Sequence, residues 1–280
     1  MINLLYTYTD RGPGKVITNL MDGLSLINEP FSTNQPISMF TKNVALQFSE
    51  QLFSEQHLKK ENLIIGPNIC TLPTDNKFVM SLNYKSIIVP SQWVKNLYEK
   101  WLPPELIKVW PVGINTNLFE DYSGENKEFD CLVYFKRRNP EELKKVISFL
   151  REKKQSYNIV QYGNYAQSDL INLCKTSKYC ILIDNTESQG IAIQEIASSN
   201  LPILCWDVNV WLDNGPDLAI EATSVPFWSN SLGERFYNLD DLEESFKNFQ
   251  EKITTYTPRE YIISNFSLAN QARKLVDFFD

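Results

Sequence analysis

Short apolar runs alternate with amphipathic stretches along all 280 residues of the chain. Most of the runs are β-branched and apolar on both faces, which is typical of strands in a parallel sheet that is covered on both sides. They predict strands at residues 3–6, 62–65, 86–89, 108–111, 130–135, 158–162, 179–184 and 201–206. The amphipathic stretches between them predict helices at residues 13–28, 43–59, 91–101, 139–150, 167–177, 189–199, 240–252 and 267–279. This alternation predicts an α/β protein with doubly wound parallel sheets.

One segment interrupts the alternation. Residues 120–129 (EDYSGENKEF) are polar, contain a glycine and have no hydrophobic period. We therefore predict an N-terminal doubly wound domain at residues 1–120 and a second one that begins at residue 121. Two doubly wound halves in tandem would place a cleft between the carboxyl ends of their strands, where α/β proteins bind ligands.

Composition and charge exclude several classes of protein. Residues 1–119 carry 10 basic and 9 acidic residues and residues 120–280 carry 17 and 25, so net charges of +1 and −8 sum to −7. The acidic second half argues against a nucleic-acid binder, which needs a basic surface. A single histidine, His57, excludes multi-histidine metal sites. Five scattered cysteines without a CxxC pair, together with the absence of a signal peptide or a long apolar run, predict a cytoplasmic protein.

Two acidic residues flank a predicted strand–loop–helix unit. Glu187 follows the strand at residues 179–184, Gly190 allows close approach of the backbone, and Glu195 lies in the helix that follows. The start of a helix holds phosphate well, and a carboxylate at position 195 can accept both hydrogen bonds of a ribose diol. The alternative is that Glu187 only caps the helix and that Glu195 is a solvated helix residue.

Three consecutive cations, Lys136, Arg137 and Arg138, directly follow the strand at residues 130–135. Cations at the carboxyl edge of a sheet, inside an acidic domain, favour an anion, because charge-assisted bonds to phosphate contribute about 1.5–3 kcal/mol each. The alternative is a solvated basic turn.

Four segments together resemble one family. Residues 187–203 look like the donor-binding segment of retaining nucleotide-sugar glycosyltransferases of the GT-B fold, with the two glutamates in an E-x7-E arrangement. Residues 87–94 (IIVPSQWV) are similar to the strand–Pro–Ser–helix element of that family. Residues 111–119 look like its crossover into the second domain, and residues 262–276 look like its closing helix. The resemblance implies Rossmann-like domains at residues 1–120 and 121–255, with residues 256–280 folding back on the first.

The resemblance also implies roles for individual residues. Lys136 and Arg137 would hold the donor diphosphate, Glu195 the ribose, and Glu187, as the catalytic residue, the transferred sugar. The backbone of Gly190, Ile191 and Ala192 would hold the sugar together with Glu187, and Gly163 would lie at the edge that meets the base. In the N-terminal domain, a glycine-rich loop would face the donor phosphate or the acceptor through Gly12, Gly14 and Lys15.

The function implied is transfer of a sugar, with retention, from a nucleoside-diphosphate sugar to an acceptor hydroxyl in glycan or polysaccharide synthesis. Such enzymes need no metal or cofactor, and this sequence has no Asp-x-Asp metal motif. The acceptor would be a glycan, a lipid-linked molecule or a small molecule, and a lipid-linked one requires proximity to a membrane. Two alternatives stay open: a non-catalytic nucleotide-sugar-binding subunit, since His57 reads as a surface residue where relatives often carry a histidine near the sugar, and a nucleotide-sugar epimerase.

Overall fold

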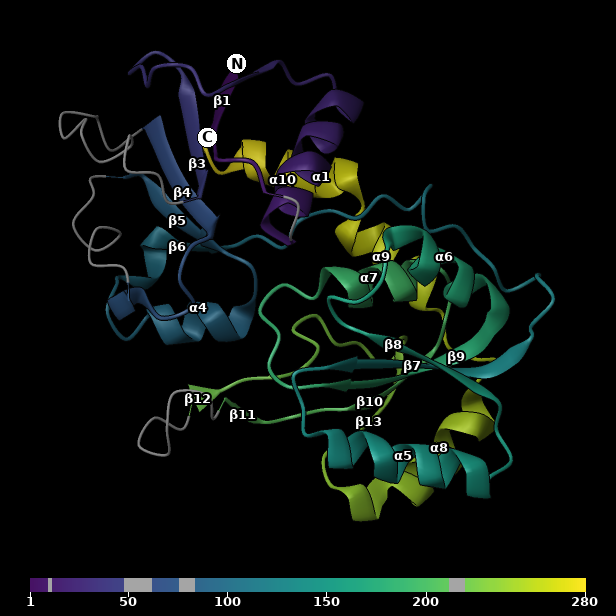
Figure 1. Cartoon of the computed structure of the whole chain (residues 1–280). Helices are drawn as coiled ribbons and strands as arrows, with labels where there is room; N and C mark the ends of the chain where they lie inside the picture. The colour runs from purple at the N-terminus through teal and green to yellow at the C-terminus, as the bar shows by residue number, and fades with distance from the viewer. Residues whose placement is uncertain (10–11, 48–61, 76–83, 212–219) are drawn as a thin grey trace. The chain divides into compact units, whose positions relative to one another are not determined.

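The computed structural model describes residues 1–9, 12–47, 62–75, 84–211 and 220–280. The chain divides into two compact units: Met1–Gly113 with Phe266–Asp280 (unit 1), and Ile114–Asn265 (unit 2). Each unit carries its own parallel sheet with helices (Figure 1). His57, the chain's histidine, lies outside the described residues.

Unit 1 is built on a sheet whose strands follow the order β2-β1-β3-β4-β5-β6 in the part of the chain that is described, and every neighbouring pair is parallel. The strands are β1 (Ile2–Leu5), β2 (Phe31–Thr33), β3 (Lys42–Gln47), β4 (Leu63–Asn68), β5 (Ser86–Val89) and β6 (Ile107–Val109). The helical elements are α1 (Gly12–Leu26), η2 (Pro73–Asp75), α4 (Gln92–Tyr98), η3 (Pro104–Leu106) and α10 (Leu268–Asp277).

The C-terminal helix α10 completes unit 1 by packing against α1 (Figure 1). The two helices approach closely because Gly23 of α1 has no side chain: a Cβ there would lie 2.6 Å from the carbonyl oxygen of Leu268. The indole Nε1 of the fully buried Trp110 donates a hydrogen bond of 2.8 Å to the carbonyl of Gln271. The last helix of the chain is therefore part of the first unit's core.

The predicted helix at residues 43–59 is wrong in its first part, because residues 43–47 belong to strand β3. Four consecutive residues of this strand, from Asn43 to Leu46, are buried, as both faces of a central strand must be. The remainder of that predicted helix, residues 48–59, lies outside the described residues.

Unit 2 contains a second parallel sheet, with the strand order β13-β10-β9-β7-β8 among its described residues. Its strands are β7 (Phe129–Lys136), β8 (Tyr157–Gln161), β9 (Ser177–Asp184), β10 (Ile203–Trp206) and β13 (Gly233–Phe236). Its helices are α5 (Pro140–Glu152), α6 (Gln167–Thr176), α7 (Ile191–Ser198), η4 (Leu239–Asp241), α8 (Leu242–Lys252) and α9 (Pro258–Phe266). The short strands β11 (Val210–Trp211) and β12 (Ile220–Glu221) pair antiparallel.

The two faces of this sheet have different partners. Helices α5 and α8 cover one face, where Val133, Phe135, Ile181 and Ile183 belong to a continuous apolar core (Figure 1). Helices α6 and α7 cover the other (Figure 1). Because successive side chains of a strand point to opposite faces, Lys136 and the last residue of β9 belong to the α6/α7 face. A polar site at this edge is thus built on a rigid apolar sheet.

The junctions between the units differ from the predicted boundaries. Residues 114–120 belong to unit 2, where the carbonyl of Phe119 accepts hydrogen bonds from Ser198 and from Arg259. At the other junction, α9 starts in unit 2, where the hydroxyl of Tyr261 donates to the carbonyl of Phe227 at 2.9 Å. The described division therefore falls at residues 113/114 and 265/266 rather than at 120/121 and 255/256.

Candidate functional site

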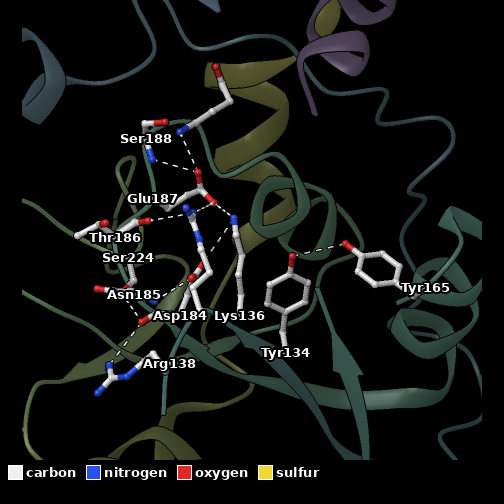
Figure 2. A network of polar contacts seen from close by, with 12 residues as sticks. Tyr134, Lys136, Arg138, Tyr165, Asp184, Asn185, Thr186, Glu187, Ser188 and Ser224 are labelled. Atoms are coloured by element: carbon white, nitrogen blue, oxygen red, sulfur yellow. Dashed lines mark hydrogen bonds and ion pairs between the residues drawn. The ribbon is translucent and has the colours of Figure 1, made fainter. Parts of the chain in front are cut away.

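Lys136 is the centre of a polar network at the carboxyl edge of the sheet in unit 2 (Figure 2). It is the last residue of β7, and its register partner on β9 is Asp184, also the last of its strand. The Lys136 Nζ forms an ion pair and hydrogen bond with Glu187 Oε2 and lies 3.7 Å from Asp184 Oδ2. With its side chain only 8 % exposed, this ammonium is neutralised from two sides rather than by water.

Glu187 lies in the loop between β9 and α7 and is buried. Burial raises its pKa, but Lys136, Arg137 and backbone N–H groups outweigh that effect and hold the pKa below its usual value. The backbone N–H groups of Ser188 and Gln189 donate to Oε1 at 3.0 and 3.3 Å. Glu187 is thus a firmly ionised carboxylate at neutral pH.

Asp184 is fully buried, and its environment differs from that of Glu187. Burial raises its pKa to about 7, against the opposing effect of Lys136 and together with the nearby charge of Glu187. Its Oδ1 accepts a hydrogen bond of 2.8 Å from the N–H of Asn185. Its Oδ2 accepts none from the described residues and faces only the Lys136 ammonium within ion-pair distance.

The three consecutive cations have three different environments. Arg137 has a positive φ of 49°, and its half-exposed guanidinium donates to the carbonyl of Thr186 at 3.2 Å, with Nη2 3.8 Å from Glu187 Oε2. Arg138 instead donates two hydrogen bonds, of 3.0 and 2.7 Å, to the carboxylate of Glu142. Arg138 therefore has a structural role in pairing with Glu142, whereas the exposed guanidinium of Arg137 is accessible to an anion from solution.

Helix α7 begins beside this network. Its N-cap, Gly190, adopts the left-handed region with φ 72°, and a Cβ there would lie 2.9 Å from a ring carbon of Phe227. Ile191 and Ala192 form the first turn and are half-buried. Glu195 is 3 % exposed and accepts a hydrogen bond of 3.3 Å from Gln167 Nε2, so the alternative of a solvated helix residue is wrong.

Tyrosines line the neighbouring edge, after β8. The ring of Tyr162 lies 4.4 Å from the Lys136 ammonium, in a cation–π contact. The hydroxyl of Tyr165 lies 3.5 Å from that of Tyr134, which the sheet places on the Lys136 face (Figure 2). Gly163 follows Tyr162 with a φ of 85° in an exposed turn, and a Cβ at that position would contact nothing within 4 Å.

The predicted residues of unit 1 lie in the first turn of α1. Gly14 must be glycine, since a Cβ there would overlap the carbonyl oxygen of Thr9. Gly12 is open to solvent, and Lys15 is half-buried. These three residues form a separate candidate segment within unit 1.

Several residues of the network were not predicted as site residues, among them Asp184, Tyr134 and Tyr165. Asp184 does give a sequence signal: a carboxylate ends an otherwise apolar buried strand, at the edge where α/β sheets bind ligands. In the described part of the chain, no group of three or more His, Cys, Asp or Glu residues is arranged to hold a metal ion. Among the same residues, no helix combines the length and the apolar character needed to cross a membrane.

Solved structures of glycosyltransferases share the fold of the whole chain. No family model and no curated protein matches the sequence. The glycosyltransferase AviGT4 of avilamycin A biosynthesis is 10% identical and superposes with a TM-score of 0.60, covering 100% of this chain and 97% of its own. The lipopolysaccharide outer core galactosyltransferase WaaB is 12% identical, with a TM-score of 0.60 and coverages of 99% and 98%.

A third similar structure is the sucrose-phosphate synthase from Thermosynechococcus elongatus, at 10% identity, a TM-score of 0.60 and coverages of 99% and 98%. The chain therefore has the GT-B fold, with two Rossmann-like domains, as the resemblance implied.

Proposed function

We propose that this protein is a glycosyltransferase that moves a sugar from a nucleoside-diphosphate sugar to an acceptor hydroxyl. The observation that carries the proposal is the network in unit 2. Lys136, Arg137 and Glu187 meet at the carboxyl edge of the sheet, beside the start of α7. This edge is where α/β folds bind nucleotides, and the fold is one that glycosyltransferases use.

The donor diphosphate would be held by Arg137 and Lys136. Arg137 has an exposed guanidinium whose N–H groups can fork to phosphate oxygens, and Lys136 lies beside it as a point charge. As the bond from the sugar to the diphosphate breaks, charge develops on the leaving oxygen, and fixed cations stabilise that charge. Side chains would stabilise this charge, without a metal or a cofactor.

The two glutamates would hold the rest of the donor. Glu195 is a buried carboxylate on α7 whose oxygens can accept the two hydroxyl groups of a ribose. Glu187, as the catalytic residue, would orient the transferred sugar together with the backbone of Gly190, Ile191 and Ala192, with retention of configuration. A nucleobase would then lie near Gly163, at the end of β8. The acceptor would be a glycan, a lipid-linked molecule or a small molecule.

The test is donor turnover. The purified protein is incubated with UDP-, GDP- and dTDP-sugars in the presence of candidate acceptors, and release of the nucleoside diphosphate is followed. We expect release with one donor, and a loss of at least tenfold in Arg137→Gln, because the exposed cation is removed. Lys144→Gln is the matched control, since Lys144 is an exposed cation on α5 that pairs with Glu141.

The other results are informative as well. Donor binding without release, for every donor and acceptor, would show a nucleotide-sugar-binding subunit instead of an enzyme. Release of a donor with an inverted sugar centre and no diphosphate would show an epimerase. Absence of binding to every nucleotide sugar would contradict the proposal altogether.

A further inference from the structure

Three charged side chains meet at the carboxyl edge of the sheet in unit 2, and they have unequal numbers of partners. One ammonium, that of Lys136, lies between two buried carboxylates, those of Asp184 and Glu187 (Figure 2). Glu187 has other partners, because Arg137 and two backbone N–H groups also stabilise its negative charge. Asp184 has the N–H of Asn185 on one oxygen and only the ammonium facing the other. Among the described residues, Lys136 is therefore the one cation within ion-pair distance of Asp184, whereas Glu187 also has Arg137.

In the described part of the chain, no second cation lies within ion-pair distance of the Asp184 carboxyl. The titratable and charged groups whose charge influences its carboxyl are Lys136 and Arg137 at the end of β7, Glu187 in the loop, Tyr134 on β7 and Cys205 on β10. Arg138 and Ser224 reach the backbone carbonyl of Asp184 and leave its carboxyl untouched. An ionised Asp184 without Lys136 would thus be a buried charge that keeps only the N–H of Asn185 as a hydrogen-bond partner among the described residues, and an uncompensated buried charge is strongly unfavourable.

We propose that Asp184 is a positioning residue, which holds the Lys136 ammonium at the site and takes up a proton when a donor diphosphate draws that ammonium away. The inference rests on the proposed function, since it needs a diphosphate at Lys136. No covalent bond changes: a proton moves from solvent to Asp184 Oδ2, and Lys136 stays protonated. Glu187 does not take the proton, because its remaining partners keep it ionised.

Proton uptake on binding determines whether the affinity for the ligand rises or falls with pH. A group that gains a proton on binding makes the ligand bind more weakly as the pH rises, by up to about tenfold per pH unit between its pKa values in the free and bound states. Burial already places the pKa of Asp184 at about 7 in the free protein, so the effect belongs above pH 7. The second ionisation of a phosphate, at a pKa of about 6, is complete there and does not interfere.

The experiment is calorimetric titration of the whole protein with UDP, GDP, ADP, CDP and TDP at pH 8. Each titration is made in two buffers of different ionisation enthalpy, because the difference in heat counts the protons taken up. With the diphosphate that binds, we expect uptake approaching one proton in the parent and none in Asp184→Asn, which imitates the protonated acid. Affinity between pH 7 and 9 should fall in the parent and stay level in the variant.

Asp130→Asn is the control, because Asp130 is the second residue of the strand that ends at Lys136, lies at the opposite edge of the sheet and pairs with Lys178. It should take up the same proton as the parent. Uptake by Asp184→Asn equal to that of the parent would overturn the positioning role and leave the proposed function intact. The parent alone is decisive if the variant does not fold, since binding without proton uptake also overturns the inference. If no diphosphate binds the parent, the proposed function fails and the inference with it.

Discussion

Lys136 and Asp184 are register partners on the adjacent parallel strands β7 and β9, and each is the last residue of its strand. The Nζ–Oδ2 distance of 3.7 Å therefore follows from strand pairing and does not depend on the path of a loop. Glu187, by contrast, reaches the same ammonium from the loop after β9. One carboxylate of the site is fixed by the sheet, and the other by the start of α7.

The buried carboxyl of Asp184 makes stability depend on pH. Its pKa is about 7 in the folded protein, against an ordinary value of 3.8. The folded state therefore binds more protons than the unfolded state between these values, and stability falls as the pH rises through that window. We expect Asp184→Asn to remove this loss, so that its stability relative to the parent rises between pH 4 and 7 by at most about 1.4 kcal/mol per pH unit.

Calorimetric unfolding across that pH range measures the difference. Asp130→Asn should show the opposite pattern: burial raises the pKa of Asp130, but its bonds to Lys178 and Ser156 outweigh burial and lower it. The parent's advantage over that variant is present at neutral pH and shrinks in acid. A parent and Asp184→Asn that keep a constant difference from pH 4 to 8 would contradict the raised pKa.

Glu195→Gln should separate the nucleoside from the phosphates. The amide keeps the size of the buried carboxylate but can accept hydrogen bonds at one atom only. Hydrogen bonds to a charged group contribute about 1.5–3 kcal/mol, so we expect nucleoside diphosphates to bind roughly 10- to 100-fold more weakly. Inorganic pyrophosphate, which lacks a ribose, should bind unchanged. Competition titrations with both ligands test this, and an unchanged nucleotide affinity would exclude Glu195 from the ribose site.

Two glycines with positive φ should respond differently to alanine. Gly190 and Gly163 have φ values of 72° and 85°, so alanine pays about 1–2 kcal/mol at either one for the left-handed conformation. Only at Gly190 would the new Cβ also press on Phe227, at 2.9 Å. We expect Gly190→Ala to lower the unfolding temperature of unit 2 further than Gly163→Ala, and to weaken nucleotide binding by displacing the start of α7. Equal effects on both quantities would refute the close contact.

Alanine in place of Gly23 should destabilise the protein, although alanine in place of glycine usually stabilises a helix. Replacing a glycine inside a helix normally stabilises it by about 0.5–1 kcal/mol. In α1 the added Cβ would lie 2.6 Å from the carbonyl oxygen of Leu268, which is backbone and cannot turn aside. We expect Gly23→Ala to destabilise unit 1 by about 1–3 kcal/mol, as overpacking does. Gly12→Ala, at the open start of the same helix, should change little. Thermal unfolding of the two variants decides, and a stabilised Gly23→Ala would refute the packing of α10 on α1.

The strands could be predicted where their burial requires a continuous run of apolar residues in the sequence. Strands such as β5 and β9 lie inside their sheets, so both faces are apolar and the run of apolar residues is continuous. The edge strands β2 and β13 lack that signal: β2 is half-buried throughout, and β13 buries only the first and last of its four residues. Strand β3 was mistaken for a helix because apolar residues continue beyond it in the sequence, at Phe48 and Leu52, with a helical spacing.

Individual residues of the site could be predicted from the sequence, but the contacts between them could not. Lys136, Arg137 and Glu187 were singled out separately, and the structure brings all three into contact. What separates Arg137 from Arg138 is the positive φ of Arg137, a backbone feature that the row of cations does not show. The contact between Asp184 and Lys136 depends on the register between strands that lie about 50 residues apart in sequence, and no local pattern encodes that register.

The packing of α10 on α1 also has a consequence for the order in which the protein forms on the ribosome. Unit 2 is one continuous stretch, so it can fold as soon as residues 114–265 have emerged. Unit 1 begins to be synthesised first but is completed last, because the backbone of Gln271 is the partner of the buried Trp110 indole. Until residues 266–280 have been synthesised, α1 and Trp110 lack their contacts with α10, and the apolar surfaces that α10 covers stay exposed. Unit 1, whose synthesis starts first, is therefore the unit whose apolar surface is exposed to premature association for the longest time during translation.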